Sequence, residues 1–479
     1  MITIEDGINN CTIINVGSKH NINKLIAFIK IYASHKKCVV IITDPSSIPI
    51  YQLISEFIDI NLTISIANSN DIYRNNKHYS NIDQFIGQAK TIFNNDLIVI
   101  LNDCNESIVN HLQKQLHEAK LLINLNNIEY NLDYFKSKTG SNIKIMAMVK
   151  ADGYGLDNNC EIAAMLQTSN IDYLGVTYID EGIFLRQKGI KIPIMLLVTD
   201  PKYFNELVQY NIEPAIYSFD ILHKILEFAK KISQYPVHIK IDTGMHRLGF
   251  LPHESNELIR ILKQNPNIVV KSIFSHLAAS DEITNDSESF SRKQINTITT
   301  IANNLEQSLG YKTIKHIANT EAVSKYPEAH LDMVRIGKGL YGLYSYNDST
   351  KKVATLKTTI AQIKDIPKND TIGYNRATTL TYNTKIAIIK IGYADGYTYK
   401  LSEKSYVLIK NQKANLLGKV CMDLCMVDVT NISCNVGDEV ILFNEDDLSI
   451  EQIADWKGSS AYEVITSISR RVKRIYIYS

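Results

Sequence analysis

The spacing of hydrophobic positions changes twice along the chain and divides it into three parts. Up to residue 116, short apolar runs alternate with amphipathic stretches of helical period, which predicts a small α/β domain. The strands predicted there are 39–43, 62–67 and 97–101, with helices at 22–32 and 108–117 and a polar loop at 68–79.

From residue 117 to 352, short apolar segments alternate with amphipathic helices. Serial strand–helix units form a parallel sheet, and about eight of them predict a closed (β/α)8 barrel of the TIM type. A doubly wound open sheet is the alternative. The predicted strands are 120–125, 143–149, 173–177, 192–198, 213–217, 237–241, 269–274, 314–317 and 333–336, and two of the helices between them are 221–232 and 292–309.

From residue 353 to 479, the helical period is lost and strand-length segments alternate with turn signals, which predicts a mainly β C-terminal domain. The last helix is expected near 450–456. The strands predicted in this part are 385–389, 405–409, 414–420, 426–429 and 439–441.

The charge of the chain is balanced, with Lys+Arg 51 against Asp+Glu 50 in 479 residues. This argues against a dedicated nucleic-acid or membrane-surface protein. We find no apolar run of membrane-spanning length and no secretory leader, so a cytoplasmic protein is expected. The seven cysteines are odd in number and scattered, and Cys421 and Cys425 lack further ligands at zinc-site spacing. Neither a disulfide framework nor a metal site is therefore expected.

Lys150 is the most informative residue, because it follows the apolar segment 143–149 in the run A-M-V-K-A-D-G-Y-G. Lysine is almost never buried without a partner. A desolvated lysine amine readily forms a Schiff base with an aldehyde, so this segment points to pyridoxal phosphate. A lysine that only reaches solvent at a strand end is the alternative.

Polar residues also follow four other predicted barrel strands. In a barrel of this type, catalytic residues gather at the C-terminal ends of the strands. Loop structure or core packing explains any one of these sets of polar residues alone. It does not explain five sets, Lys150 included, that meet at one end of the barrel. The four further sets are 242–247, 275–276, 319–320 and 335–339.

Eight segments, in order along the chain, are A-M-V-K-A-D-G-Y-G, K-I-D-T-G-M-H-R-L-G-F, F-S-H-L-A-A-S-D-E, H-I-A-N-T-E-A, M-V-R-I-G-K-G-L-Y-G-L, I-G-Y-A-D-G-Y, G-K-V-C-M-D and A-Y-E-V-I-T-S-I-S-R-R-V. Together they resemble the motifs of alanine racemase, a fold-type III pyridoxal phosphate enzyme, over roughly 118–479. One such motif is weak, whereas eight in order are specific.

The resemblance implies racemisation of L-alanine to D-alanine for peptidoglycan synthesis by two bases. Lys150 would hold the cofactor and serve one face of the substrate. Tyr393 would serve the other face from the partner subunit of a homodimer. Racemisation removes the α-proton from one face and returns a proton to the other, so two opposed bases suit it. Nearby cations would lower the pKa of both groups.

The resemblance also implies the binding residues. Arg335 would face the pyridine nitrogen, which should stay unprotonated because arginine keeps its proton. His276 would lie beside the ring and link Arg335 to Tyr393. Further cofactor-binding residues, most of them at the phosphate, would be Tyr154, Asn319, Thr320, Gly337, Lys338 and Tyr462.

The substrate carboxylate would be bound by Arg247 and by the backbone of Met422, with Asp423 beside it. Lys240 matches a lysine that is carbamylated in many members of the family, where it orients the arginine that matches Arg247. The chain departs from the family pattern without losing any of these groups. The departures are Leu156 and Asp157 for His-Gly, Thr320 for serine, Ala461 for proline or serine, and Thr398 and Tyr399 for proline and arginine.

Two other functions compete with an alanine racemase. One is a broad-specificity amino-acid racemase, which differs in pocket size. The other is a non-catalytic pyridoxal phosphate protein, which the presence of Tyr393 and of the β domain disfavours. A decarboxylase on a related barrel is disfavoured by Arg335, because those relatives place an acid at the ring nitrogen.

Residues 1–116 precede the region of resemblance. The run H-E-A-K-L-L-I-N-L-N-N-I-E-Y-N-L resembles the junction in chains that fuse the cell-wall ligase MurF to alanine racemase. The resemblance implies a shortened remnant of the C-terminal domain of the ligase, without its ATP-binding domain and with a scaffold role. An unrelated α/β cap is the alternative.

Overall fold

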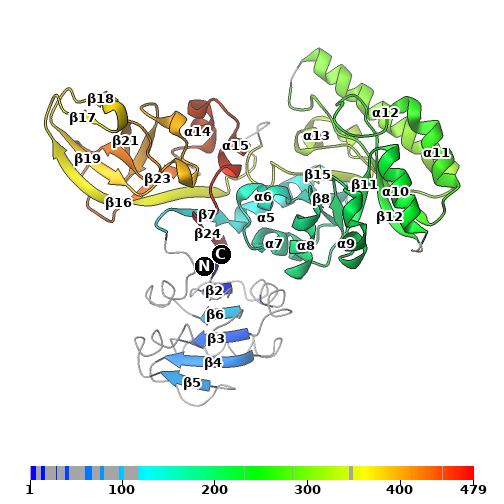
Figure 1. The fold of residues 1–479 in the computed structure, drawn as a ribbon, viewed down its shortest axis with the longest axis horizontal. Helices are drawn as coiled ribbons and strands as arrows, with labels where there is room; N and C mark the ends of the chain where they lie inside the picture. Colours follow the sequence, from blue (N-terminus) through cyan, green and yellow to red (C-terminus); the bar gives the residue numbers. More distant parts are fainter. Residues whose placement is uncertain are drawn as a thin grey trace. The chain divides into compact units, whose positions relative to one another are not determined.

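The computed structural model describes residues 2–6, 12–16, 29, 38–42, 60–66, 76–79, 97–101 and 117–478, apart from 231, 233, 283, 345–348 and 445. These residues belong to two compact units. Figure 1 shows their helices and strands, coloured by position in the sequence. The first, the barrel unit, comprises residues 127–153 and 162–351. The second, the sheet unit, comprises residues 1–126, 154–161 and 352–479.

The barrel unit contains eight parallel strands in the order β14-β13-β12-β11-β10-β9-β8-β15. Hydrogen bonds from Asp332 N–H to the Lys315 carbonyl (3.0 Å) and from Arg335 N–H to the Ala318 carbonyl (3.1 Å) join the two ends and nearly close it. The barrel prediction is confirmed, and the open sheet is wrong. The strands are β8 Lys144–Met148, β9 Tyr173–Val176, β10 Ile194–Leu196, β11 Glu213–Ile216, β12 Tyr235–Lys240, β13 Ile268–Phe274, β14 Ile314–His316 and β15 Met333–Ile336.

Helices alternate with the strands in this part of the chain. Helix α12 begins at Asn285, seven residues before the predicted start, because the Thr284 hydroxyl accepts a hydrogen bond from Ser287 N–H (3.1 Å). It ends at Leu309, and the Gly310 that follows has a φ of 80°, which suits glycine. The helices are α5 Leu125–Lys138, α6 Lys150–Gly155, α7 Glu161–Thr168, α8 Ile179–Gln187, α9 Phe204–Gln209, α10 Phe219–Ala229, α11 Ser255–Lys263, α12 Asn285–Leu309 and α13 Thr320–Lys325.

Strand β7 (Lys120–Asn124), predicted as the first barrel strand, belongs instead to the sheet unit. It pairs in parallel with β24 (Lys473–Tyr478) and antiparallel with β16 (Ala354–Ile366). Its residues alternate between buried and half-buried, whereas every residue of β9, β10 and β15 is buried. Alternation is typical of a sheet with one covered face. The alternating burial therefore distinguishes β7 from the barrel strands, whereas the length of the strand does not.

The remaining strands of the C-terminal part confirm the predicted β domain. Its prediction missed β16 and β24, and it was wrong to place the last helix at 450–456, because α15 follows α14. The elements are β17 Thr371–Ile372, β18 Thr378–Thr379, β19 Thr384–Ile389, β20 Tyr406–Ile409, β21 Gln412–Leu417, β22 Cys425–Asp428, β23 Glu439–Phe443, α14 Ile450–Lys457 and α15 Ala461–Thr466. Single 3₁₀ turns are η3 Pro201–Tyr203, η4 Pro252–Glu254, η5 Pro327–Ala329, η6 Tyr374–Arg376, η7 Tyr393–Asp395 and η8 Tyr399–Leu401.

The N-terminal strands continue the same sheet. Strand β1 (Ile2–Asp6) pairs antiparallel with β24, and β2, β6, β3, β4 and β5 follow outward from it. The three predicted strands are confirmed, but 76–79 is strand β5 rather than loop. The predicted helices at 22–32 and 108–117 lie almost wholly outside the described residues. The strands are β2 Thr12–Val16, β3 Cys38–Ile42, β4 Ile60–Ile66, β5 Asn76–Tyr79 and β6 Leu97–Leu101.

Candidate active site

Lys150 begins a left-handed turn at the C-terminal end of β8. The φ angles of Ala151, Asp152 and Tyr154 are 52°, 52° and 61°, a region that costs non-glycine residues about 1–2 kcal/mol each. Glu181 on α8 holds this turn, because its carboxylate accepts hydrogen bonds from Ala151 N–H and from Thr177 N–H, both 2.6 Å. Strained backbone conformations such as these cluster at functional sites, so the turn is a candidate part of an active site.

The side chain of Lys150 is half-buried among other cations of the barrel unit. Burial and the charge of Arg247 lower the pKa of its amine, and the carboxylate of Glu181 opposes them. A lowered pKa leaves more of the amine neutral, and only the neutral amine attacks an aldehyde or accepts a proton.

Arg335 on β15 is buried, with 6% of its surface exposed. Its Nη2 donates to the carbonyls of Ser275 (2.7 Å) and Ile317 (3.1 Å) and to His276 Nδ1 (3.1 Å). Burial and the nearby Arg247 lower its pKa to about 9, so the guanidinium still carries its charge at neutral pH.

A chain of buried hydrogen bonds runs from Arg335 across the barrel. Arg335 Nη1 contacts His316 Nδ1 (2.7 Å), and His316 Nε2 contacts the Ser272 hydroxyl (3.0 Å). That hydroxyl contacts His238 Nδ1 (2.6 Å), and His238 Nε2 contacts the Glu213 carboxylate (2.9 Å). Arginine only donates, so His316 Nδ1 accepts from Arg335, and the neutral His316 donates to Ser272 through Nε2. A carboxylate only accepts, so His238 donates to Glu213 through Nε2.

His276 and Lys240 lie within the same group of cations. Burial and the charge of Arg335 are the largest causes that hold the pKa of His276 well below its usual value, so its imidazole is neutral. Burial and the charges of Arg247 and Arg335 lower the pKa of Lys240 to about 8. Its Nζ lies 5.6 Å from the centre of the Phe274 ring.

Arg247 is exposed and follows a short loop that Asp242 holds. The Asp242 carboxylate accepts hydrogen bonds from the N–H groups of Gly244 (2.9 Å) and His246 (3.0 Å). Burial raises the pKa of Asp242, but these two bonds outweigh burial and lower it. An ionised Asp242 thus fixes the turn that presents Arg247.

Thr320 and the glycine turn after β15 are packed together. The buried Thr320 hydroxyl accepts hydrogen bonds from the N–H groups of Gly337 (3.0 Å) and Gly339 (3.4 Å), which leaves its own proton for an acceptor. Position 339 has no room for a side chain, because a Cβ there would lie 2.6 Å from the Thr320 methyl group. Asn319 caps α13 and contacts the Ser280 hydroxyl (2.8 Å), and Lys338 pairs with Glu321.

The sheet unit carries the other predicted site residues. Tyr393 lies in the 3₁₀ turn η7 and is 44% exposed, and Met422 is 53% exposed. Their backbones meet in neighbouring loops, since Ala394 N–H donates to the Met422 carbonyl (3.0 Å). Burial and the nearby Tyr462 raise the pKa of Tyr154 to about 12, so its hydroxyl is a hydrogen-bond donor.

The structure thus gathers Lys150, Lys240, Arg247, His276 and Arg335 in the barrel unit, and places Tyr154, Tyr393, Met422 and Tyr462 in the sheet unit. The sequence analysis missed Glu181 and the chain from His316 to Glu213. Two signals could have pointed to the chain. His238 precedes Lys240 by two residues on the same strand, and His316 opens the H-I-A-N-T motif.

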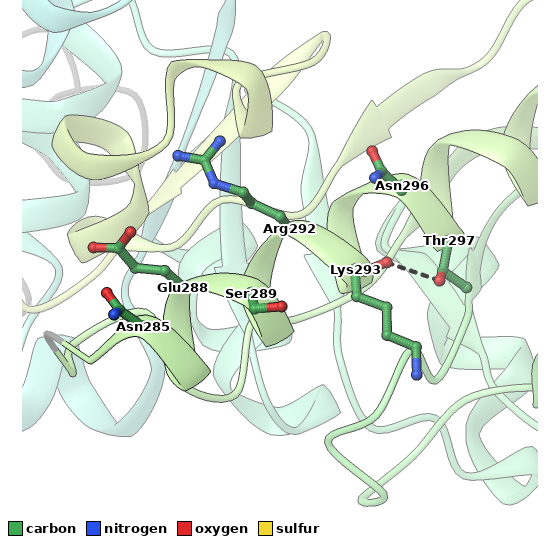
Figure 2. Close-up of a pocket in the computed structure, with 7 residues that line it drawn as sticks. All are labelled: Asn285, Glu288, Ser289, Arg292, Lys293, Asn296 and Thr297. Carbon is green, nitrogen blue, oxygen red and sulfur yellow. Dashed lines mark hydrogen bonds between the residues drawn. The ribbon is translucent and has the colours of Figure 1, made fainter.

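Other features of the described residues do not extend this site. Figure 2 shows a hollow on the exposed face of α12, lined by polar residues of that helix alone, such as Glu288 and Lys293. Among the described residues, no group of three or more His, Cys, Asp and Glu side chains is placed to bind a metal ion. In that same part of the chain, no helix is long and apolar enough to cross a membrane. Cys421, Cys425 and Cys434 are free thiols.

Most of the chain is similar to known proteins. The family model of the alanine racemase N-terminal domain matches residues 123–345, and that of the C-terminal domain matches residues 353–476. The alanine racemase of Clostridium tetani is 38% identical over 378 residues, which are 76% of this chain and 96% of that protein. The alanine racemase of Desulforamulus reducens is 37% identical over 74% of this chain and 98% of its own length.

Solved structures agree with these matches. The alanine racemase of Clostridium difficile 630 superposes with a TM-score of 0.71 at 36% identity, covering 76% of this chain and 97% of its own. The alanine racemase of Bartonella henselae, described with covalently bound pyridoxal phosphate, superposes with a TM-score of 0.68 at 26% identity. It covers 75% of this chain and 99% of its own.

Proposed function

The chain belongs to the alanine racemase family, and from that premise we propose which of its residues interconvert L- and D-alanine. The observation that carries the proposal is the placement of Lys150. A lysine with a lowered pKa is held by a strained turn at the end of a barrel strand, close enough to Arg247 to feel its charge. Supply of D-alanine for peptidoglycan, in the cytoplasm, is the role that we propose for the enzyme.

The residues present fit pyridoxal phosphate as the cofactor. The Lys150 amine matches its aldehyde, the charged Arg335 matches its ring nitrogen, and the Thr320 hydroxyl has a proton to give to its phosphate. The matching residues of the family add Tyr154, Asn319, Gly337, Lys338 and Tyr462 to this set, with His276 beside the ring. When bound, the cofactor would supply an aldehyde for the amino group of alanine and a ring that withdraws electrons from its α-carbon.

In our proposal, the two proton-transfer groups are Lys150 Nζ on one face of the α-carbon and Tyr393 Oη on the other. Each group removes the α-proton of one enantiomer. When the other enantiomer is the substrate, the same group delivers a proton to its own face of the α-carbon. Arg247 and the Met422 N–H hold the carboxylate of alanine, which keeps the α-carbon between the two bases. The neutral His276 accepts a hydrogen bond from Arg335 and leaves the charge on the guanidinium.

We propose a homodimer in which Tyr393 serves the site of the partner subunit. Tyr393, Met422 and Leu424 are apolar or aromatic side chains that are 44%, 53% and 41% exposed on neighbouring loops. Such a cluster of exposed apolar groups marks an interaction surface. A second copy of the chain is the occupant that the family resemblance supports.

We propose that Lys240 carries a carbamate. Its buried amine lies among the charges of Arg247, Arg335 and Lys150, and its pKa of about 8 leaves part of it neutral near pH 8. The nitrogen of a neutral amine bonds to the carbon of CO₂ and loses one proton to water, so the product carries a negative charge where the protonated lysine carries a positive one. Intact-protein mass should exceed the sequence mass by one CO₂ in bicarbonate, and Lys240→Met should abolish this gain. An unchanged mass contradicts the carbamate.

We propose that residues 1–116, 117–352 and 353–479 are the domains along the sequence, with β7 contributed to the sheet of the third. The first is proposed as the remnant of the MurF ligase, with a scaffold role. The pairing of β1 with the edge of β24 supports this role, because an uncovered strand edge invites aggregation. Removal of 1–116 without loss of solubility or activity would contradict it.

The assignment of the second base is tested by Tyr393→Phe, with the exposed Tyr399→Phe as a matched control. Loss of a general base lowers kcat by about a hundredfold or more. Tyr393→Phe should show this loss, while one enantiomer still exchanges its α-proton through Lys150. Tyr399→Phe should keep the kcat of the wild type. A Tyr393→Phe enzyme with wild-type kcat contradicts the assignment.

A further inference from the structure

The turn that carries Tyr393 is fixed between two other segments of the sheet unit. On one side, Tyr393 N–H donates to the Cys421 carbonyl (3.0 Å), and Ala394 N–H donates to the Met422 carbonyl (3.0 Å). This approach is so close that a Cβ at Gly392 would lie 2.3 Å from the Met422 carbonyl oxygen. The position of Tyr393 therefore depends on that of the loop around Met422.

On the other side, the turn is fixed by Asp395, whose side chain is fully buried. One carboxylate oxygen accepts a hydrogen bond from Gly392 N–H (2.9 Å), within the same turn. The other accepts one from Arg471 Nε (2.6 Å) and lies 3.3 Å from His117 Nε2. The Asp395 carbonyl also accepts a hydrogen bond from Ser469 N–H (3.0 Å).

Arg471 joins the two loops. While its Nε binds Asp395, its Nη2 binds the Asp423 carboxylate (2.6 Å), next to Met422. A guanidinium is a rigid, planar fork, so two carboxylates bound to it are held at a fixed separation. Lysine, a single point charge on a flexible stem, does not impose this geometry.

We propose that Asp395, Arg471 and Asp423 form a clasp of positioning residues, which holds the Tyr393 turn in register with the loop of Met422. The inference rests on the proposed function, in which Tyr393 moves a proton and Met422 binds the carboxylate of alanine. None of the three clasp residues is required to touch the substrate. Their effect is to fix the distance between the base and the bound carboxylate.

The test measures proton transfer to the wrong face. Each alanine enantiomer is incubated in D₂O, and NMR compares deuterium uptake with retention of configuration to uptake with inversion. The ratio does not depend on the fraction of active enzyme, so partial unfolding does not change it. The variants are Asp395→Asn, Arg471→Lys and Asp423→Asn. The control is Asp438→Asn, which removes a surface carboxylate paired with Lys410 in the same unit (3.0 Å).

If Tyr393 is displaced, Lys150 delivers deuterium to the same face of the α-carbon from which it removed the proton. For the enantiomer served by Lys150, we expect the ratio of retention to inversion to rise about tenfold or more, since misplacement by about 1 Å can cost a hundredfold in rate. The ratio of the Asp438→Asn control should equal that of the wild type. If Asp395→Asn does not fold, Asp423→Asn decides the test, because the side chain of Asp423 is 57% exposed.

The outcomes separate the two proposals. If the wild-type enzyme racemises alanine and the clasp variants keep the wild-type ratio of retention to inversion, the clasp alone is overturned. A wild-type enzyme that does not racemise alanine overturns the proposed function, and the clasp with it. A raised ratio in Arg471→Lys, where the positive charge is kept, supports the geometric role of the guanidinium.

Discussion

Arg335 and Glu213 stand at opposite ends of one hydrogen-bond chain, with His316, Ser272 and His238 between them. Because the first group only donates and the last only accepts, both histidines donate through Nε2. A neutral His316 adds no second positive charge beside Arg335. The motifs of the sequence predicted Arg335 and its neighbour His276, but not the other members of this chain, because contacts among β11, β12, β13 and β14 leave no periodic signal in the sequence.

Removal of the acceptor at the end of this chain should destabilise the barrel. Glu213→Ala leaves the His238 Nε2–H buried without a partner, which costs about 1–3 kcal/mol of unfolding free energy. Glu213→Gln is the matched control, because its amide oxygen still accepts the hydrogen bond. Urea unfolding measures both variants. Equal losses for Ala and Gln would contradict the direction assigned to the chain.

The pKa of Lys150 gives a prediction with a definite sign. Burial and Arg247 lower this pKa, so cofactor-free protein should react with pyridoxal phosphate at a rate that rises with pH and levels off below pH 10.5. Arg247→Met removes a positive neighbour and should move the midpoint to higher pH. Arg260→Met, at an exposed pair with Glu257 on α11, should leave the midpoint unchanged. Stopped-flow absorbance gives the rates, and an unmoved midpoint in Arg247→Met refutes this account of Lys150.

Among the elements, the turn after β8 shows most clearly where local sequence and structure disagree. The run A-D-G-Y-G supplies glycine at two positions, yet Ala151, Asp152 and Tyr154 also adopt positive φ. A tertiary hydrogen bond from Ala151 N–H to the Glu181 carboxylate holds this conformation against local preference. The pattern of the chain predicted eight barrel strands correctly, because they are short, apolar and regularly spaced. It misplaced β7, since a short run predicts a strand without telling which sheet it joins.

Strain in this turn should appear as a gain in stability when it is relieved. Ala151→Gly should raise the unfolding free energy by about 0.5–1 kcal/mol, because glycine adopts positive φ at little cost. Ala163→Gly, in the regular helix α7, should lower it by about 1 kcal/mol or more. Thermal unfolding of both variants compares them. A loss in Ala151→Gly as large as in Ala163→Gly shows that the turn is not strained.

For the whole molecule, the proposed shared site predicts that two inactive variants regain activity when their subunits are mixed, which a monomeric enzyme would not show. Lys150→Ala and Tyr393→Phe should each abolish racemisation alone. In a mixed dimer, one active site contains both substitutions, and the other active site contains a native Lys150 and a native Tyr393. Random mixing of subunits should therefore restore about a quarter of wild-type activity, as expected for an isologous dimer. A mixture that stays inactive after confirmed subunit exchange places both bases in the same subunit.

The organisation of the chain was predicted only in part from its sequence. The strand periods predicted an N-terminal α/β domain, but not the pairing of β1 with β24, which makes one continuous sheet of the first and last strands. Such a pairing joins residues more than 470 positions apart, such as Ile2 and Tyr478, and the local pattern cannot encode it. The motifs, in contrast, predicted the family from local runs alone.

The most direct test of the proposed racemisation is proton NMR of L-alanine in D₂O with wild-type protein and pyridoxal phosphate, followed beside an assay for D-alanine. We expect the α-proton signal to be lost while D-alanine accumulates to equality with L-alanine. Protein that is shown to hold the cofactor, yet neither exchanges the α-proton nor forms D-alanine, would contradict it.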